Sequence, residues 1–287
     1  MRARLILNAD DFGLTRGINR AIAELAAAGA LTSATLMASG SAFDDAIAVA
    51  RAHPSLGIGC HIVLVDGKPV SPPESILSLL GPDRRSFRPT LRSFLTALFT
   101  GRIRAEEIER EAVAQIRKLQ AAGIAVTHID THKHTHLFPA AAGPLLAAAE
   151  QCGVCAIRDP FEPAWSLALH QGDMKRSAAI RLLSAFLPRW HALPQLRDRR
   201  ILTTDGTVAV SATGALNWHT LGRILSALPD SGTYELCCHP GYHDHELDHV
   251  TTRLRAHREI ERDALLAEIP QLRSGPSSPD LIHFGDL

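Results

Sequence analysis

Leu5-Ile6-Leu7-Asn8-Ala9-Asp10-Asp11-Phe12-Gly13 is the stretch that decides the fold class of this chain. Its apolar start predicts a short strand. Two adjacent carboxylates follow directly, before a glycine and a helix that Thr15 caps. Burying an ionised carboxylate is costly unless the group is paired or binds a metal, so a packed core does not explain this pair. Helix capping explains one aspartate at most. The pair therefore indicates a functional site where a strand leads into a helix.

Downstream of this strand, short apolar segments alternate with amphipathic helical stretches, which predicts a parallel sheet. We find no dinucleotide-binding fingerprint, P-loop or internal repeat. The extent of the pattern favours an α/β fold with a distorted (βα) TIM-like barrel, expected to be seven-stranded, over an open doubly wound sheet. The candidate strands are residues 4–9, 33–37, 56–64, 125–129, 154–158, 208–210, 233–238 and 281–284. The expected helices are residues 15–28, 42–53, 105–122, 140–151, 176–187, 218–228 and 251–269.

Two long stretches, residues 65–104 and 161–200, do not follow this alternation. Both hold several prolines and large apolar side chains. Long insertions in compact domains are often functional, so lids or substrate walls beside the barrel mouth are one interpretation. Packing against the barrel, or a dimer contact, is the other. We therefore expect a single (βα)-barrel domain over residues 1–287 with these two insertions.

The bulk composition excludes several classes of function. The 287 residues have a formal net charge of zero and a pI near 7.3, so no basic field attracts nucleic acid or an anionic membrane. Five cysteines, an odd number, do not make a disulfide framework, and the isolated Cys152-Gly153-Val154-Cys155 indicates core or surface thiols. No signal peptide or transmembrane run is visible, so we expect a cytoplasmic protein. Histidine is abundant, at 15 residues, which fits metal or proton chemistry.

Polar motifs follow three further candidate strands. His61 lies in the strand over residues 56–64, a His-rich run occupies residues 128–136, and His239 follows the strand over residues 233–238. Barrel enzymes gather their chemistry where strands end. Carboxylates and imidazoles brought there from separate strands can chelate one ion, which predicts a divalent-metal site with a spare carboxylate as base.

The His-rich run offers more ligands than one ion needs. In an extended segment side chains alternate, so we expect Asp130, His132, His134 and His136 to point the same way. Local spacing does not choose among them.

With these motifs, the chain resembles the YdjC-like carbohydrate deacetylases. The resemblance runs from the first strand to about Leu265 and is weak over residues 70–104 and 161–200. The motifs that carry it are Asn8-Ala9-Asp10-Asp11-Phe12-Gly13, Gly59-Cys60-His61-Ile62-Val63-Leu64 with Gly67-Lys68-Pro69, His128-Ile129-Asp130-Thr131-His132-Lys133-His134-Thr135-His136, and Glu235-Leu236-Cys237-Cys238-His239-Pro240-Gly241-Tyr242.

This resemblance implies a distorted barrel and a divalent metal held by Asp11, His61 and His132. It implies Asp10 as the general base and His239 as an acid or a substrate contact. Magnesium is the family's usual metal, although Asp and His ligands also accept Zn²⁺, Mn²⁺ or Co²⁺. The implied substrate is an N-acetylated amino sugar, such as an N-acetylglucosamine-containing oligosaccharide or glycolipid. Some relatives are associated with hopanoid biosynthesis, and a homodimer is the family-based expectation.

The remaining candidates have structural alternatives. Asp130 is expected to orient a ligand imidazole rather than bind metal. His136 lines the site or its rim, and the role of His134 stays open. Arg158, at a strand end, orients Asp10, binds substrate or forms a structural salt bridge.

Three rival functions remain for this set of residues. An iron(II) oxygenase triad usually sits in a jelly roll, which the alternation of strands and helices disfavours. A metal-dependent hydrolase of phosphate or glycosidic bonds is allowed by the same residues. A sugar-binding protein without activity would predict a broken ligand set, and here the set is complete.

Overall fold

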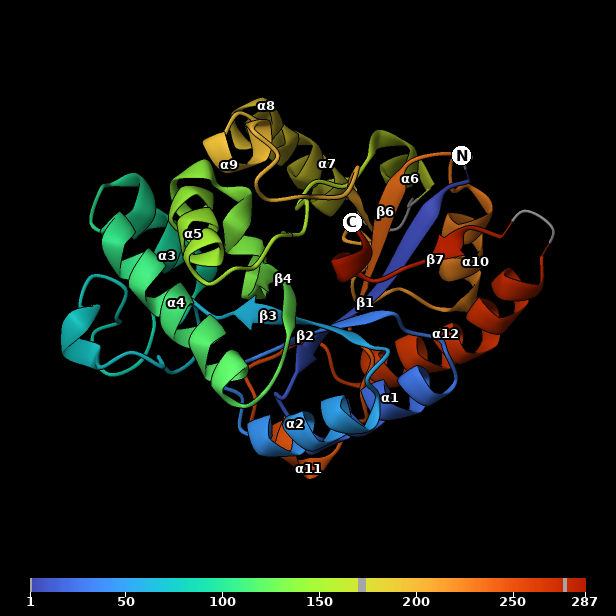
Figure 1. Cartoon of the computed structure of the whole chain (residues 1–287), viewed down its shortest axis with the longest axis horizontal. Coiled ribbons are helices and arrows are strands. Elements are labelled where there is room, and N and C mark those ends of the chain that lie inside the picture. The colour runs from blue at the N-terminus through green and yellow to red at the C-terminus, as the bar shows by residue number, and fades with distance from the viewer. Residues whose placement is uncertain (1, 170–173, 276–277) are drawn as a thin grey trace.

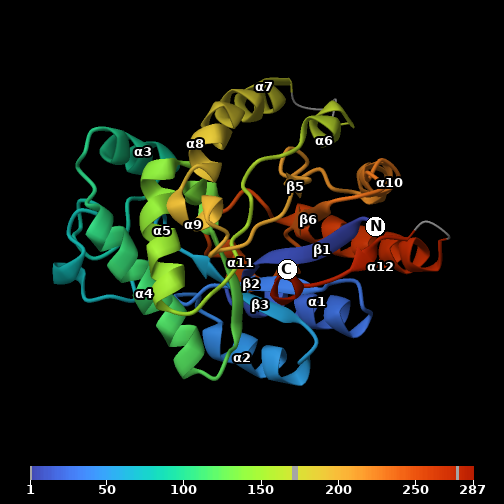
Figure 2. The same ribbon diagram turned by 45° about the horizontal axis from the view of Figure 1, so that its top comes forward.

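β1 (Arg4–Phe12) lies near the middle of a parallel sheet. The computed structural model describes residues 2–169, 174–275 and 278–287, and within them seven strands pair in the order β4-β3-β2-β1-β6-β5, with β7 on β1. Figures 1 and 2 show that this sheet curls. The other strands are β2 (Ser33–Leu36), β3 (Gly57–Ile62), β4 (Val126–Thr131), β5 (Thr207–Val208), β6 (Thr233–Cys238) and β7 (Asp280–Leu281).

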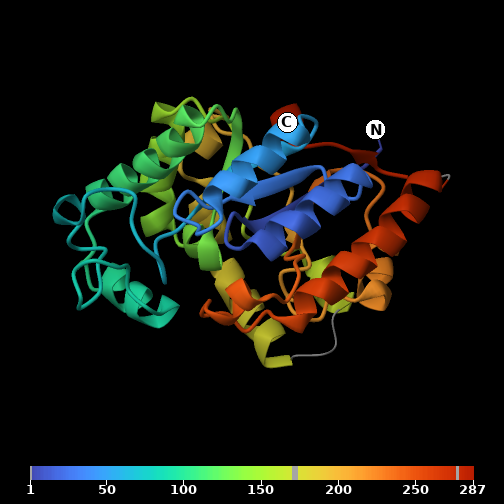
Figure 3. The same ribbon diagram turned by 90° about the horizontal axis from the view of Figure 1, so that it is seen from below.

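Amphipathic helices cover the outside of the sheet. The first begins where predicted, after Thr15, whose Oγ1 accepts a hydrogen bond from the Ile18 N–H. Seen from below, α1 and α2 lie side by side across the sheet, and α12 runs along its other half (Figure 3). No described helix is long and apolar enough to cross a membrane. The helices are α1 (Arg16–Ala27), α2 (Phe43–Ala52), α3 (Leu91–Phe99), α4 (Ala105–Ala121), α5 (Pro139–Gln151), α6 (Ala164–Leu169), α7 (Met174–Leu183), α8 (Leu187–His191), α9 (Pro194–Arg197), α10 (Trp218–Ser226), α11 (His245–Asp248) and α12 (Ala256–Ser274), with 3-10 turns η1 (Pro73–Ser75), η2 (His132–Leu137), η3 (Ser184–Phe186) and η4 (Phe284–Asp286).

The predicted α/β class and barrel-like sheet are confirmed, with corrections at three candidate strands. The strand expected over residues 208–210 ends at Val208 of β5, before Ala209 with its positive φ of 70°. Residues 154–158 do not form a strand. They make isolated bridges instead, Ile157 with Ile129 of β4 and Ala156 with Leu202. This irregular wall lies between β4 and β5, so the sheet is a half-barrel rather than an evenly closed one. At the third correction, β7 ends at Leu281 and Phe284 already belongs to η4.

The two insertions carry helices and meet at aromatic rings. Phe99 of α3 and Phe186 of η3 both pack against Phe138, with ring centroids 5.5 Å away in each case. Phe138 directly follows η2, so the insertions meet beside the His-rich segment. Residues 170–173, inside the second predicted insertion, lie outside the described part of the chain. Closure of either insertion over the site, and the single-domain organisation, stay predictions.

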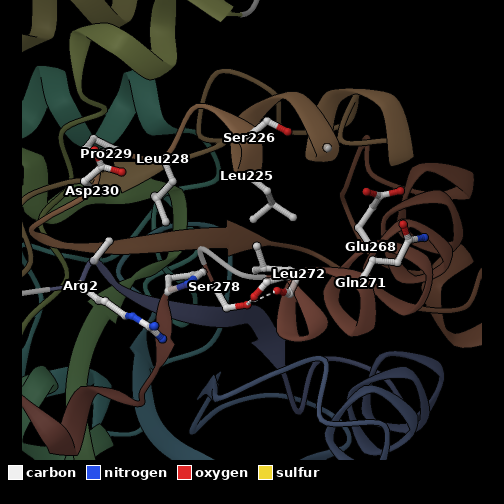
Figure 4. Close-up of a pocket in the computed structure, with 14 residues that line it drawn as sticks. Arg2, Leu225, Ser226, Leu228, Pro229, Asp230, Glu268, Gln271, Leu272 and Ser278 are labelled. Atoms are coloured by element: carbon white, nitrogen blue, oxygen red, sulfur yellow. Dashed lines mark hydrogen bonds between the residues drawn. The ribbon is translucent and has the colours of Figure 1, made fainter.

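The interior near the strand starts is filled by the C-terminal turn. The ring of Phe284 stacks on His128 of β4, with centroids 3.7 Å apart, and also packs with Ile6 and Ala156. A separate hollow of about 930 Å³ lies between α10, α12 and the starts of β1, β6 and β7, lined among others by Arg2, Leu228 and Glu268 (Figure 4). This hollow is at the opposite end of the sheet from the predicted site residues.

Candidate metal and catalytic site

A bulge at the end of β1 brings both aspartates to the same site. In a regular strand, neighbouring side chains face opposite sides. Here β1 pairs with β2 at Ala9 and again at Phe12, one residue out of step, and Asp11 has a left-handed backbone with φ of 63°. The bulge turns Asp11 toward the histidines while Asp10 keeps its inward position. Both side chains are almost fully buried.

Asp11, His61 and His132 converge as predicted. The Oδ1 atom of Asp11 lies 3.7 Å from Nε2 of His61 and 3.4 Å from Nδ1 of His132. The three ligand atoms all lie within 4.8 Å of one another. Protein oxygens and imidazole nitrogens bind divalent transition metals at about 2.0–2.2 Å, so one ion between these atoms would reach all three. This donor set fits a divalent metal ion.

Asp130 contacts the His61 imidazole on the side away from Asp11, an arrangement in which a carboxylate can orient a metal-binding histidine. Nδ1 of His61 lies 2.8 Å from Oδ1 of Asp130, which directs Nε2 toward Asp11. Burial alone would lower the pKa of His61. The Asp130 carboxylate, with Asp10 and Asp11, outweighs burial and raises this pKa to about 9.

Arg158 lies at the centre of the buried charges. Its guanidinium donates hydrogen bonds to both oxygens of Asp10, at 2.9 and 2.6 Å, and lies 2.7 Å from Asp130. It also donates to Glu235 of β6 at 2.5–2.9 Å. Burial would raise the pKa of Asp10, but Arg158 holds it well below its usual range. For Glu235 burial prevails over Arg158 and raises the pKa to about 7.

Two other groups of potential ligands are already engaged in protein contacts. Asp10 with Cys237 and His239, and Asp10 with His61 and Asp130, also bring ligand atoms close together. Both oxygens of Asp10 accept hydrogen bonds from Arg158, and Asp130 is divided between Arg158 and His61. Burial raises the pKa of the Cys237 thiol well above its usual value, which disfavours the thiolate that binds metals. Asp11, His61 and His132 are therefore the best-suited set.

The predicted alternation across the His-rich run is wrong. Only β4, through Thr131, is extended. His132 starts a 3-10 turn in which Lys133 and His134 have positive φ angles of 59° and 50°. His132, directly after the extended Thr131, faces Asp11, and the kink that follows separates it from His136, which is fully buried.

The surroundings of His136 and His134 favour the neutral imidazole. Nδ1 of His136 pairs with Oγ1 of Thr131 at 2.6 Å, and Nε2 has no hydrogen-bond partner among the described residues. Burial, reinforced by His134 and Arg158, lowers the pKa of His136 well below its usual value. Burial and Arg158 likewise lower the pKa of His134 to about 3. Neither side chain is among the three clustered ligand sets.

His239 faces Asp10 from the end of β6. Its Nε2 lies 3.7 Å from Oδ2 of Asp10, and its backbone N–H donates to Glu261 of α12 at 2.6 Å. Arg258, one turn earlier in α12, donates from Nη2 to Oδ2 of Asp11 at 2.6 Å. Burial would raise the pKa of Asp11, but Arg258, helped by His132, holds it well below its usual range.

Sequence reasoning missed Glu235, Glu261 and Arg258. Glu235 carried a usable signal, since it shares the inward face of β6 with Cys237 and precedes His239 by four residues. No local pattern marks Arg258, which is separated from Asp11 by 247 positions in the chain.

Comparison with known proteins places the chain among sugar-modifying enzymes. The profile of a family described as YdjC-like protein matches residues 4–271. The chain is 35% identical over 241 residues to a carbohydrate deacetylase of Brevibacillus brevis, covering 84% of this chain and 82% of the relative. It is 32% identical over 260 residues to a carbohydrate deacetylase of Mus musculus, covering 84% and 79%.

A solved structure shares the fold. A protein from Enterococcus faecalis, named for cellobiose-phosphate cleavage, superposes with a TM-score of 0.77 over 100% of this chain and 99% of its own. At 23% sequence identity this likeness describes architecture alone.

Proposed function

This chain belongs to the YdjC-like protein family, and from that premise we propose that it is a metal-dependent carbohydrate deacetylase. Its substrate would be an N-acetylated amino sugar, and the products would be acetate and the free amine. The observation that carries the proposal is the convergence of Asp11, His61 and His132 beside a carboxylate, Asp10, that is left outside the ligand set. Metal-assisted amide hydrolysis needs this combination of ligands and a separate base.

The three ligands would hold one divalent ion and leave positions open for water and substrate. When bound, the ion would polarise the amide carbonyl and lower the pKa of water, which addresses the poor electrophilicity of an amide. Asp130, bonded to Nδ1 of His61, would leave Nε2 free to hold the ion. Two imidazoles among three ligands suit Zn²⁺, Mn²⁺ or Co²⁺ at least as well as Mg²⁺, which prefers oxygen.

Asp10 and His239 would carry the protons. Asp10 would accept a proton from the attacking water, and its low pKa keeps the carboxylate ionised at neutral pH for that step, although Arg158 also makes it a weaker base. His239 faces the same space, with Nε2 3.7 Å from Oδ2 of Asp10, and would protonate the leaving amine. Arg158 holds Asp10 in place through two hydrogen bonds.

Acetate release tests this proposal. We expect release from N-acetylglucosamine oligosaccharides or glycolipids, its loss with a chelator, and its return with added metal. Asp10→Asn should lower kcat by about 10²- to 10⁴-fold, the usual contribution of a general base, and leave stoichiometric metal binding intact. Asp44→Asn, an exposed aspartate on α2, is the matched control and should act as the native protein.

Three outcomes would count against the proposal. Acetate release that persists with a chelator would show that the reaction does not need a metal. Full activity in Asp10→Asn would show that Asp10 is not the base. Metal binding without acetate release would keep the site but point to another bond, and phosphate or glycoside substrates would be tested next.

A further inference from the structure

Helix α12 lies outside the sheet, yet two of its side chains reach the site. Arg258 and Glu261, three positions apart on one helix face, are each 1% exposed. Arg258 donates to Asp11 at 2.6 Å, and Glu261 accepts the backbone N–H of His239 at 2.6 Å. One helix therefore contacts both a proposed metal ligand and a proposed acid.

Asp11 needs support from its surroundings because its backbone is strained. A left-handed φ of 63° is sparsely populated for a residue with a Cβ, and it persists only where surrounding contacts hold it. Both side-chain oxygens of Asp11 have defined directions. Oδ2 accepts the hydrogen bond from Arg258, and Oδ1 faces His61 and His132.

Arg258 is itself fixed from its other side. Its Nε donates to the carbonyl of Leu254 at 3.1 Å, and its own carbonyl accepts the Gly241 N–H at 3.2 Å. A Cβ on Gly241 would come within 3.0 Å of Cδ of Arg258, so this side chain packs directly on the chain that follows His239. The guanidinium therefore has little freedom to leave Asp11.

We propose that Arg258 is a positioning residue that makes Asp11 a one-oxygen metal ligand, by occupying Oδ2 and leaving Oδ1 for the ion. The inference rests on the proposed metal role of Asp11. Removing a side chain that holds a metal ligand in this way usually lowers metal affinity by about 10- to 100-fold.

Metal titration separates positioning from simple charge. Mn²⁺ binding is measured by calorimetry on folded protein with Arg258→Met, Arg258→Lys and the control Arg273→Met, an exposed arginine on the same helix. We expect Mn²⁺ to bind about 10- to 100-fold more weakly to Arg258→Met than to the native protein. The affinity of Arg258→Lys should lie between these two, and that of Arg273→Met should equal the native affinity. If Arg258 acted only as a nearby cation, its removal would tighten Mn²⁺ binding. Tighter or unchanged binding overturns the proposal.

A second measurement works without metal. In chelator-treated protein, unfolding by urea is compared for Arg258→Met, Asp11→Asn and the double variant. A positioning contact predicts that the second substitution lowers the unfolding midpoint little once the first is present. Additive losses would show that the two side chains are not coupled and would overturn the inference. Coupling in a native protein that binds no Mn²⁺ would instead reject the proposed metal function and reduce Arg258 to a structural partner.

Discussion

At the scale of single residues, Arg158 is the group on which the interior most depends. One guanidinium faces the carboxylates of Asp10, Asp130 and Glu235, and all four side chains are buried. Such an arrangement adds little net stability compared with an apolar core, but removing the single cation leaves several charges without compensation. The same contacts hold Asp10, the proposed base, in place, so the proposed mechanism makes activity depend on Arg158 as well.

Arg158→Met should lower the free energy of unfolding by about 3 to 5 kcal/mol at pH 7, the usual cost of breaking a buried charge pair. The pKa of Asp10 is lower in the folded protein than in the unfolded chain, so its contribution is fully present above the unfolded pKa near 4. The contribution is lost as pH falls through the folded pKa. Urea denaturation should therefore show the gap between native and variant narrowing below about pH 4. A gap that is constant with pH would contradict this account.

The residues near β1, β3 and β4 were predictable because their chemistry stands out in sequence. Paired aspartates after an apolar strand have few structural uses, and Asp11, His61 and His132 lie together as expected. Arg158 was predictable only as a set of alternatives, and its buried contacts with Asp10, Asp130 and Glu235 fit both the orienting role and the structural salt bridge. Arg258 was not predictable, because a contact across 247 positions leaves no periodic trace in a single sequence.

At the scale of elements, α4 attaches the first insertion to the barrel. Glu111, fully buried, accepts the backbone N–H groups of Val70 and Ser71 at 2.8 and 2.9 Å. Glu107 accepts the N–H of Ser78 at 2.7 Å in the same way. These glutamates satisfy backbone donors that an irregular, partly buried segment cannot pair by itself.

Glu111→Ala should leave the buried N–H of Ser71 and the half-buried N–H of Val70 without their partner, at a cost of about 1–3 kcal/mol for the buried group and less for the other. The effect should be local, because the donors belong to one insertion. Hydrogen exchange followed by mass spectrometry should show faster exchange around residues 66–80 and little change in β1 or β6. Glu106→Ala, an exposed glutamate on the same helix, serves as the control. Equal exchange in both variants would refute the attachment.

Element boundaries were predictable where one local signal dominates and unpredictable where the sheet becomes irregular. Thr15 starts α1, and α4 spans Ala105–Ala121 against an expected 105–122. The segment over 154–158 is apolar enough to suggest a strand, but it makes only isolated bridges. The kink at Lys133 and His134 requires two residues with positive φ. Glycine is the usual sequence signal for such a backbone, and neither residue is a glycine.

At the scale of the whole molecule, the half-barrel is filled by polar groups near the strand ends and by Phe284 near the strand starts. The β-then-α alternation predicted this architecture because a parallel sheet needs helical crossovers. It could not predict the filling of the interior, since Phe284 and His128 meet only when the C-terminal turn folds under the sheet.

Phe284→Ala should lower the free energy of unfolding by about 3–5 kcal/mol, the range for truncating a buried aromatic ring. The ring is 1% exposed, so its loss creates a cavity beneath His128. The melting temperature is the measurement, with Leu266→Ala on the surface of α12 as control. A shift no larger than that of the control would show that the turn is dispensable.

The distance in sequence between Asp11 and Arg258 has a consequence for how the protein is made. During translation β1 is synthesised before its partner strand β6 and before α12. Asp11 can accept its hydrogen bond from Arg258 only after α12 has been made. A nascent chain would carry Asp11 without its cationic partner, Arg258, for most of synthesis. If Asp11 binds the proposed metal ion, capture of that ion would therefore come late in biogenesis, after α12 has folded against β1.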